Sequence, residues 1–183
     1  KTLGDKCYMY WHCSWPDLGF DLPKLIRNCK YSNKILLTYL CRNCGTVFPY
    51  LWNDARTGCI KCGQYSAFLT STQVGVPDEI LSNIFNIFDI YVQMAILEGF
   101  GVPLVEAAAC STPVIATEWT GPIDIIKKTQ GYGIKILNTF VEAESGRVCG
   151  LPDLNDFVEK LYKFLSLPEP LRRKKGAQAR AAV

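Results

Sequence analysis

Four cysteines in the N-terminal half of the chain have the spacing of a metal site. They form two Cys-x-x-Cys pairs separated by fourteen residues, and a glycine follows each pair, at Gly45 and Gly63. Glycine accepts a positive φ, so each short loop can turn back on itself and four thiolates can meet at one tetrahedral ion. The pattern predicts a zinc ribbon over residues 41–66 with a structural zinc ion. The predicted metal ligands are Cys41, Cys44, Cys59 and Cys62.

A closed shell of four thiolates leaves no coordination position for water or substrate, so we expect the metal to have no catalytic role. Disulfide bonds and redox or iron–sulfur chemistry are the alternatives for these cysteines. The five other cysteines stand singly in apolar or helical contexts, which is typical of small core residues. Thiolate ligands must stay reduced, and this favours a cytoplasmic location.

A second constellation combines carboxylates with glycines. Glu98 and Glu106 are separated by seven residues and bracket the turn Gly99-Phe100-Gly101, and Glu106 falls in the first turn of a predicted helix. A helix start offers unpaired N–H groups and a positive dipole to an anion, so phosphates are expected there. Glu106 can then accept both hydroxyls of a ribose, and Glu98 the hydroxyls of a sugar beyond the phosphates. The alternative is a solvated loop residue and a glutamate that complements the helix dipole.

Composition limits the class of protein that carries these residues. The chain has 183 residues, of which 49% are apolar and 20% charged, so it can bury a substantial core, and disorder and collagen-like repetition are excluded. A net charge of +3 indicates no particular partner. No apolar run approaches the roughly 20 residues that span a bilayer, and no signal peptide is apparent. The chain enters a strand almost at once, so we expect it to be part of a longer protein.

Strands and helices are predicted to alternate along the chain. This order indicates an α/β fold with a doubly wound parallel sheet, in which ligands bind at the carboxyl ends of the strands. The zinc ribbon is expected as a small insertion after the second strand. Predicted strands cover 6–13, 35–40, 89–94, 113–117 and 132–137, and predicted helices cover 22–29, 77–88, 103–110, 121–129, 153–165 and 169–182.

Several motifs in this order resemble a known family. They are residues 84–92, the run Glu98-Gly-Phe-Gly-Val-Pro-Leu-Val-Glu106-Ala, the run Thr112-Pro-Val-Ile-Ala-Thr117 and the loop Thr120-Gly-Pro-Ile-Asp124. Together they resemble the C-terminal, donor-binding domain of retaining GT-B glycosyltransferases of the group 1 (family 4) type. The resemblance covers roughly 76–180, and more loosely the strands at 6–13 and 34–40.

The resemblance implies one Rossmann-like, nucleotide-sugar-binding domain over 1–183 with the ribbon inserted at 41–66. It implies transfer of a sugar, of the hexosyltransferase type, from a nucleotide-sugar donor with retained configuration and usually without a catalytic metal. Glu106 would bind the ribose, Glu98 would be the catalytic-site residue beside the transferred sugar, and nearby amides would contact the diphosphate or sugar. The implied donor-binding residues are Gly99, Phe100, Gly101, Val102, Glu106, Thr120 and Gly121.

This sequence also departs from the family pattern. The basic pair that grips the diphosphate has no assignable counterpart, since neither Lys1 nor Lys6 fits it with confidence. The acceptor-binding N-terminal domain is missing, so we expect a sugar, glycan or lipid-linked acceptor to be met outside this chain, and the chain alone to be inactive. The ribbon has no counterpart in the common pattern.

Two other functions stay open. Zinc ribbons often bind nucleic acid or protein, and this one carries Arg42, Arg56 and Lys61 together with the aromatic residues Phe48, Tyr50 and Trp52. Three basic residues are few, so we expect no nucleic acid as a partner. A GT-B sugar epimerase or phosphorylase is the third possibility, but Glu-Gly-Phe-Gly followed by Glu-Ala fits the transferases better.

Overall fold

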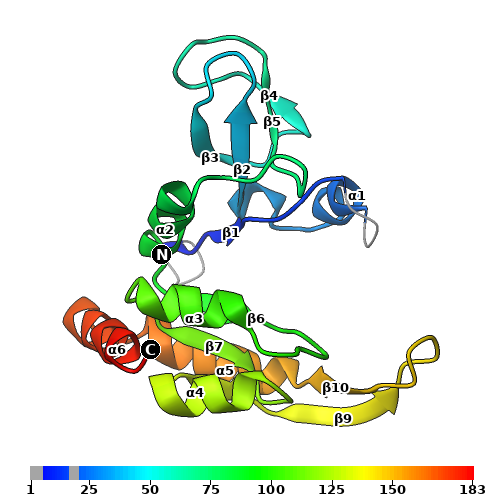
Figure 1. Ribbon diagram of the computed structural model, residues 1–183, viewed down its shortest axis with the longest axis vertical. Coiled ribbons are helices and arrows are strands. Elements are labelled where there is room, and N and C mark those ends of the chain that lie inside the picture. The colour runs from blue at the N-terminus through cyan, green and yellow to red at the C-terminus, as the bar shows by residue number, and fades with distance from the viewer. Residues whose placement is uncertain (1–5, 17–20) are drawn as a thin grey trace. The chain divides into compact units, whose positions relative to one another are not determined.

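The computed structural model describes residues 6–16 and 21–183. The chain divides into two compact units, Lys1–Ile80 and Leu81–Val183, which run from blue to green and from green to red in Figure 1. Each unit has its own strand pairings, and no strand pairing among the described residues joins the two units. Within the same residues, no helix is long and apolar enough to cross a membrane.

The sheet of the first unit is built on its longest strand, β2. β2 pairs in parallel with β1 and antiparallel with β3 and β5, and β4 pairs antiparallel with β5. A short helix, α1, and a 3-10 turn lie between β1 and β2. The bounds are β1 Met9–Trp11, α1 Leu22–Arg27, 3-10 turn Ser32–Lys34, β2 Ile35–Cys41, β3 Val47–Leu51, β4 Arg56–Thr57 and β5 Ala67–Leu69.

Alternate residues of β2 form the core of this unit. Successive side chains of a strand point to opposite faces, so Leu37, Tyr39 and Cys41 share the face that packs with Ile26 of α1. The ring of Tyr39 stacks on Phe48 with centroids 6.1 Å apart. The Tyr39 hydroxyl donates a 2.6 Å hydrogen bond to the Asp54 carbonyl. The core therefore fixes both ends of the chain segment that carries the first cysteine pair.

The second unit contains a three-stranded parallel sheet in the order β6-β7-β8, followed by an antiparallel hairpin of β9 and β10. Helix α2 ends in this unit and begins just before it. The bounds are α2 Asp78–Asn86, β6 Tyr91–Gln93, α3 Val102–Ala109, β7 Val114–Thr117, α4 Pro122–Thr129, β8 Tyr132–Ile134, β9 Ile136–Val141, β10 Val148–Pro152, α5 Leu154–Leu165 and α6 Glu169–Ala181.

Helices cover both faces of the parallel sheet. On one face Val114 and Ala116 pack with Leu104 of α3 and with residues of α2 and α4. On the other face the ring of Tyr132 packs edge-on against Phe164 of α5, with centroids 5.8 Å apart. Parallel strands covered in this way are consistent with the expected Rossmann-like α/β architecture.

The structure differs from the expected fold in two respects. The predicted strands at 6–13 and 35–40 were expected to join one parallel sheet with the later strands, but β1 and β2 pair only with strands of the first unit among the described residues. The hydrogen-bonding groups of β2 are used within the first unit, in its pairing with β1, β3 and β5. The predicted strand 132–137 ends at Ile134, and the hairpin that follows was not predicted.

Most other elements lie within a few residues of their predicted limits. Helix α3 covers Val102–Ala109 against a predicted 103–110, and α5 covers Leu154–Leu165 against 153–165. The sequence predicts one domain over 1–183 with an insertion at 41–66. The structure divides into two compact units after Ile80, and the predicted domain limits remain a prediction.

Two threonines, one just before β7 and one at its end, give a matched test of buried hydrogen bonding, since both residues are 1% exposed. The Thr112 hydroxyl donates a 2.7 Å hydrogen bond to the Phe85 carbonyl, whereas the Thr117 hydroxyl has no partner among the described residues. Thr112→Val should lower the free energy of unfolding by about 1 kcal/mol, and Thr117→Val should leave it unchanged or raise it by a similar amount. Urea denaturation followed by far-UV circular dichroism measures both, and an equal loss in the two variants would contradict the expectation.

Candidate functional site

Glu98 lies in the loop that joins the carboxyl end of β6 to α3. Its Oε1 accepts hydrogen bonds from the N–H groups of Phe100 at 3.3 Å and Gly101 at 3.2 Å. Gly101 is the N-cap of α3 and has φ 91°, a left-handed conformation that favours glycine. The positive end of α3 further favours a negative charge at this point. The carboxylate is therefore fixed inside the turn that precedes the helix.

A second loop, at the carboxyl end of β7, is tied to the first. The Thr120 hydroxyl accepts from the Glu98 N–H at 3.3 Å and lies 2.8 Å from the Glu98 carbonyl, to which Gly121 N–H also donates at 3.2 Å. The two backbones approach so closely that a Cβ on Gly121 would stand 2.2 Å from the Gly99 carbonyl oxygen. The structure thus brings together the predicted residues of both loops, Glu98 to Gly101 with Thr120 and Gly121.

Two residues of this site were missed in the sequence, and both belong to β6. Gln93 donates from Nε2 to the Glu98 Oε2 at 2.8 Å. Tyr91, two residues earlier on the same face, is partly buried near both glutamates, and its pKa is raised to about 12 by burial and by the Glu106 and Glu98 carboxylates. The period of two along a strand that leads into the glutamate loop is the signal that could have found them.

Glu106 belongs to α3 and is half-buried on the side of Tyr91. No described basic side chain forms an ion pair with Glu98 or Glu106. The Phe100 and Val102 side chains are exposed, at 61% and 55%. The Val102 N–H is the first amide of α3 and has no partner within the helix. The site can therefore offer carboxylates to hydroxyl groups and a helix start to an anion.

The hairpin of β9 and β10 is attached to the same two loops. Gly150 N–H donates to the Ile96 carbonyl at 2.8 Å, and the Trp119 indole N–H donates to the Val148 carbonyl at 3.3 Å. A Cβ on Gly150 would stand 2.8 Å from the Trp119 ring, so the indole packs directly on the strand backbone. The hairpin therefore braces the segments that precede Glu98 and Thr120.

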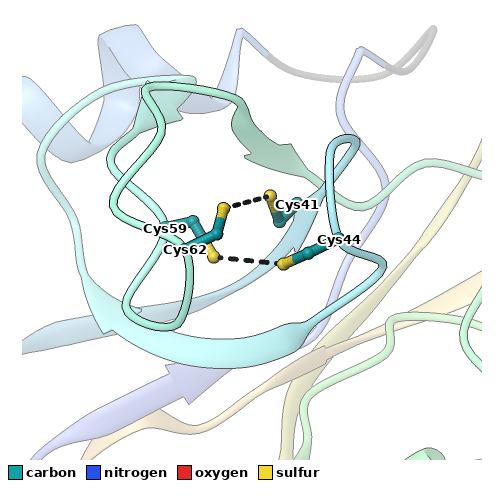
Figure 2. Close-up of side chains that lie close together, drawn as sticks. All are labelled: Cys41, Cys44, Cys59 and Cys62. Atoms are coloured by element: carbon teal, nitrogen blue, oxygen red, sulfur yellow. Dashed lines mark hydrogen bonds between the residues drawn. The ribbon is translucent and has the colours of Figure 1, made fainter.

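The four predicted ligand cysteines come together in the first unit (Figure 2). Their Sγ atoms all lie within 4.8 Å of one another, with Cys41 and Cys62 at 3.7 Å and Cys44 and Cys59 at 3.6 Å. A tetrahedral ion with metal–sulfur bonds of about 2.3 Å requires sulfur atoms about 3.8 Å apart, which these two pairs match, so the cluster can hold a metal ion.

The backbone of each cysteine pair has the predicted turn. Gly45 and Gly63 have φ values of 70° and 72°, and their N–H groups donate back to the Cys41 and Cys59 carbonyls. The predicted positive φ at both glycines is confirmed.

One hydroxyl group lies beside each of two of the sulfur atoms. The Ser66 hydroxyl lies 3.1 Å from the Cys41 sulfur, and this hydrogen bond, together with the backbone amides of Asn43 and Cys44, lowers the Cys41 pKa to about 6. The Thr46 hydroxyl lies 3.2 Å from the Cys44 sulfur and lowers its pKa in the same way. Both contacts favour the thiolate form that binds metals.

The aromatic residues that sequence analysis grouped with the ribbon's basic residues are not the ones in contact with its arginines. Phe48 is a core residue, 2% exposed. The Arg42 guanidinium lies 4.3 Å from the Phe68 ring centroid, and Arg56 lies 5.1 Å from the same centroid and 4.7 Å from that of Tyr65. Strand register explains the difference, because Arg56 and Phe68 are paired across β4 and β5.

Comparison with known proteins bears on this site. The family model for glycosyl transferases group 1 matches residues 72–182, more than half of the chain and all of the glutamate loop. A sucrose synthase from Melioribacter roseus is 42% identical over 78 residues. That match covers 42% of this chain but 8% of the sucrose synthase, so the chain spans only a small part of the relative's length.

The contact between the two loops can be tested with a pair of glycines. A Cβ at Gly99 meets nothing within 4 Å, whereas one at Gly121 collides with the Gly99 backbone. Gly121→Ala should therefore lower the thermal unfolding midpoint of the chain by several degrees, and Gly99→Ala should change it little. Differential scanning calorimetry of the two variants decides this, and equal midpoints would argue against the close approach.

The cysteine cluster predicts one bound zinc ion per purified chain. Cys59→Ser should lose the ion and destabilise the first unit, because Cys59 is buried in the core of that unit. Cys29→Ser, at an exposed single cysteine, is the matched control and should keep the ion. Elemental analysis of the purified chains gives the stoichiometry, and a full zinc content in Cys59→Ser would exclude this ligand set.

Proposed function

The chain belongs to the glycosyl transferases group 1, and on that premise we propose that residues 81–183 bind the nucleotide-sugar donor of a retaining glycosyltransferase. The observation that carries this proposal is the joining of two loops at the carboxyl ends of β6 and β7 by the Glu98 carbonyl and the Thr120 hydroxyl. Ligands of Rossmann-like sheets bind at this edge. We assign the unit to the C-terminal domain of the GT-B architecture.

Each part of the proposed site has a chemical role. Glu106, on α3, accepts the two hydroxyls of the ribose, for which a carboxylate has two suitably spaced oxygens. The start of α3, with the Val102 N–H, faces the negative charge of the diphosphate. Glu98 and the amides of the Gly99-Phe100-Gly101 turn lie beside the transferred sugar, and Thr120 and Gly121 hold that turn from the second loop.

The same residues favour departure of the nucleotide diphosphate. Negative charge grows on the diphosphate as its bond to the sugar breaks, and a fixed helix start stabilises that charge without reorganising. The two carboxylates would repel the diphosphate if they were free to approach it. Glu98 is instead held by the Phe100 and Gly101 amides and by Gln93, which direct its charge into the turn.

We further propose that Cys41, Cys44, Cys59 and Cys62 hold a structural zinc ion. When bound, the ion would join the two cysteine turns with a closed shell of four thiolates.

The acceptor, which we expect to be a sugar, glycan or lipid-linked molecule, would be bound by residues outside those described above. We therefore expect donor binding, but no sugar transfer, from this chain alone.

Glu106→Ala tests the proposal. The chain should bind one of UDP, GDP and ADP in a calorimetric titration, and the variant should bind that nucleotide at least about tenfold more weakly, because a charged acceptor of two hydroxyls is lost. Glu159→Ala, an exposed glutamate of α5, is the matched control and should bind like the unmodified chain. Undiminished binding by Glu106→Ala would exclude the ribose role, and no binding of any nucleotide by the unmodified chain would count against donor binding.

A further inference from the structure

Gln93, the last residue of β6, can place its side-chain amide against the Glu98 carboxylate in only one orientation. Its Nε2 donates to Glu98 Oε2 at 2.8 Å. The reverse orientation would set the amide oxygen against a carboxylate oxygen, two acceptors without a proton between them. The charge of Glu98 therefore fixes the amide, and Gln93 Oε1 points away from it. That oxygen is buried and has no hydrogen-bond partner among the residues that the structure describes.

A buried oxygen without a hydrogen bond is unfavourable. The Gln93 side chain nevertheless leaves Oε1 without a partner among the described residues while Nε2 donates to Glu98. The hydrogen bond from Gln93 is one of several that the protein makes to the oxygen atoms of Glu98. Oε2 is taken by Gln93, Oε1 by the N–H groups of Phe100 and Gly101, and the main-chain carbonyl by Thr120 and Gly121. Both carboxylate oxygens are thus occupied by the protein itself.

From this arrangement we infer that Gln93 is a positioning residue, which sets the Glu98 carboxylate so that the Gly99-Phe100-Gly101 turn has the shape that receives the sugar of the donor. Without the amide, Oε2 would be partly buried without a donor, and the carboxylate would turn toward solvent and release the Phe100 and Gly101 amides. The inference rests on the proposed function for its ligand, a nucleotide sugar. The positioning of the turn itself depends only on the contacts described above.

Two substitutions distinguish the positioning of Glu98 by the Gln93 amide from a role of Gln93 in packing alone. Gln93→Met keeps the length of the side chain but has no donor. Gln93→Glu has a donor only when protonated. The carboxylate that faces it is Glu98, and Tyr91, which is near both Glu98 and Glu106, lies two residues earlier on the same strand. The Glu98 carboxylate raises the pKa of the new Glu side chain, and Tyr91 stays neutral through the neutral range, since its pKa is about 12.

The Gln93→Glu variant should therefore recover in acid. At about pH 5.5 the protonated carboxyl donates to Glu98 as the amide does, and at about pH 8 two carboxylates face each other and repel. Gln178→Glu adds the same charge at an exposed position of α6 and is the matched control.

The first measurement is hydrogen exchange of the Phe100 and Gly101 amides by NMR, which needs no ligand. Gln93→Met should exchange both amides at least about tenfold faster than the unmodified chain at every pH, and Gln93→Glu should do so at about pH 8 but not at about pH 5.5. Gln178→Glu should exchange like the unmodified chain. Unchanged exchange in Gln93→Met, or equal acceleration of Gln93→Glu at both pH values, would overturn the positioning role.

The second measurement is titration with UDP, GDP and ADP and with the glucose conjugate of each. Gln93→Met should weaken binding of the preferred nucleotide glucose at least about tenfold and leave binding of the nucleotide alone within about twofold. Equal binding of the conjugate by both chains would overturn the sugar role. If the unmodified chain binds no nucleotide, the proposed function fails and the sugar role with it, while the exchange data still decide the positioning role.

Discussion

The hydrogen bonds around the Glu98 carboxylate hold the second unit's proposed site together. A charged acceptor that is half-buried is unfavourable unless donors surround it, and here the donors come from the strand before it, the turn after it and the start of the next helix. The Glu98 main chain meets the loop after β7 in the same small volume. One residue thus connects the carboxyl ends of two neighbouring parallel strands, which is the edge where such sheets bind ligands.

The first unit depends on a different constraint. Its sheet is small, and two of the four clustered cysteines, Cys41 and Cys59, are part of its buried core. Two pairs of these sulfur atoms lie 3.7 Å and 3.6 Å apart, close to the edge of a tetrahedral metal site, and Ser66 and Thr46 supply donors that favour thiolates at Cys41 and Cys44. A metal ion here would act as part of the core. Its binding would add to the folding stability of a small sheet that has few apolar residues to bury.

The sequence predicted best where chemistry and spacing coincide. The cysteine cluster follows from two short repeats whose glycines adopt the expected positive φ, and α3 follows from a proline and small residues after a glycine turn. The roles of Tyr91 and Gln93 could not be predicted with the same ease, because they depend on which face of β6 meets the glutamate loop. The pairing of Arg56 with Phe68 depends on strand register, which no local pattern specifies. The hairpin of β9 and β10 was missed because most of its residues are exposed and show no clear alternation of apolar and polar types.

The attachment of that hairpin has a consequence for how the glutamate loop responds to a ligand. A loop bound only at its two ends samples many shapes, and a ligand that selects one of them loses affinity in proportion. Here the segment before Glu98 is also held by Gly150, and the segment before Thr120 by Val148 through the Trp119 indole. The loop therefore loses its conformational entropy when the chain folds, and ligand binding does not carry the free-energy cost of ordering it.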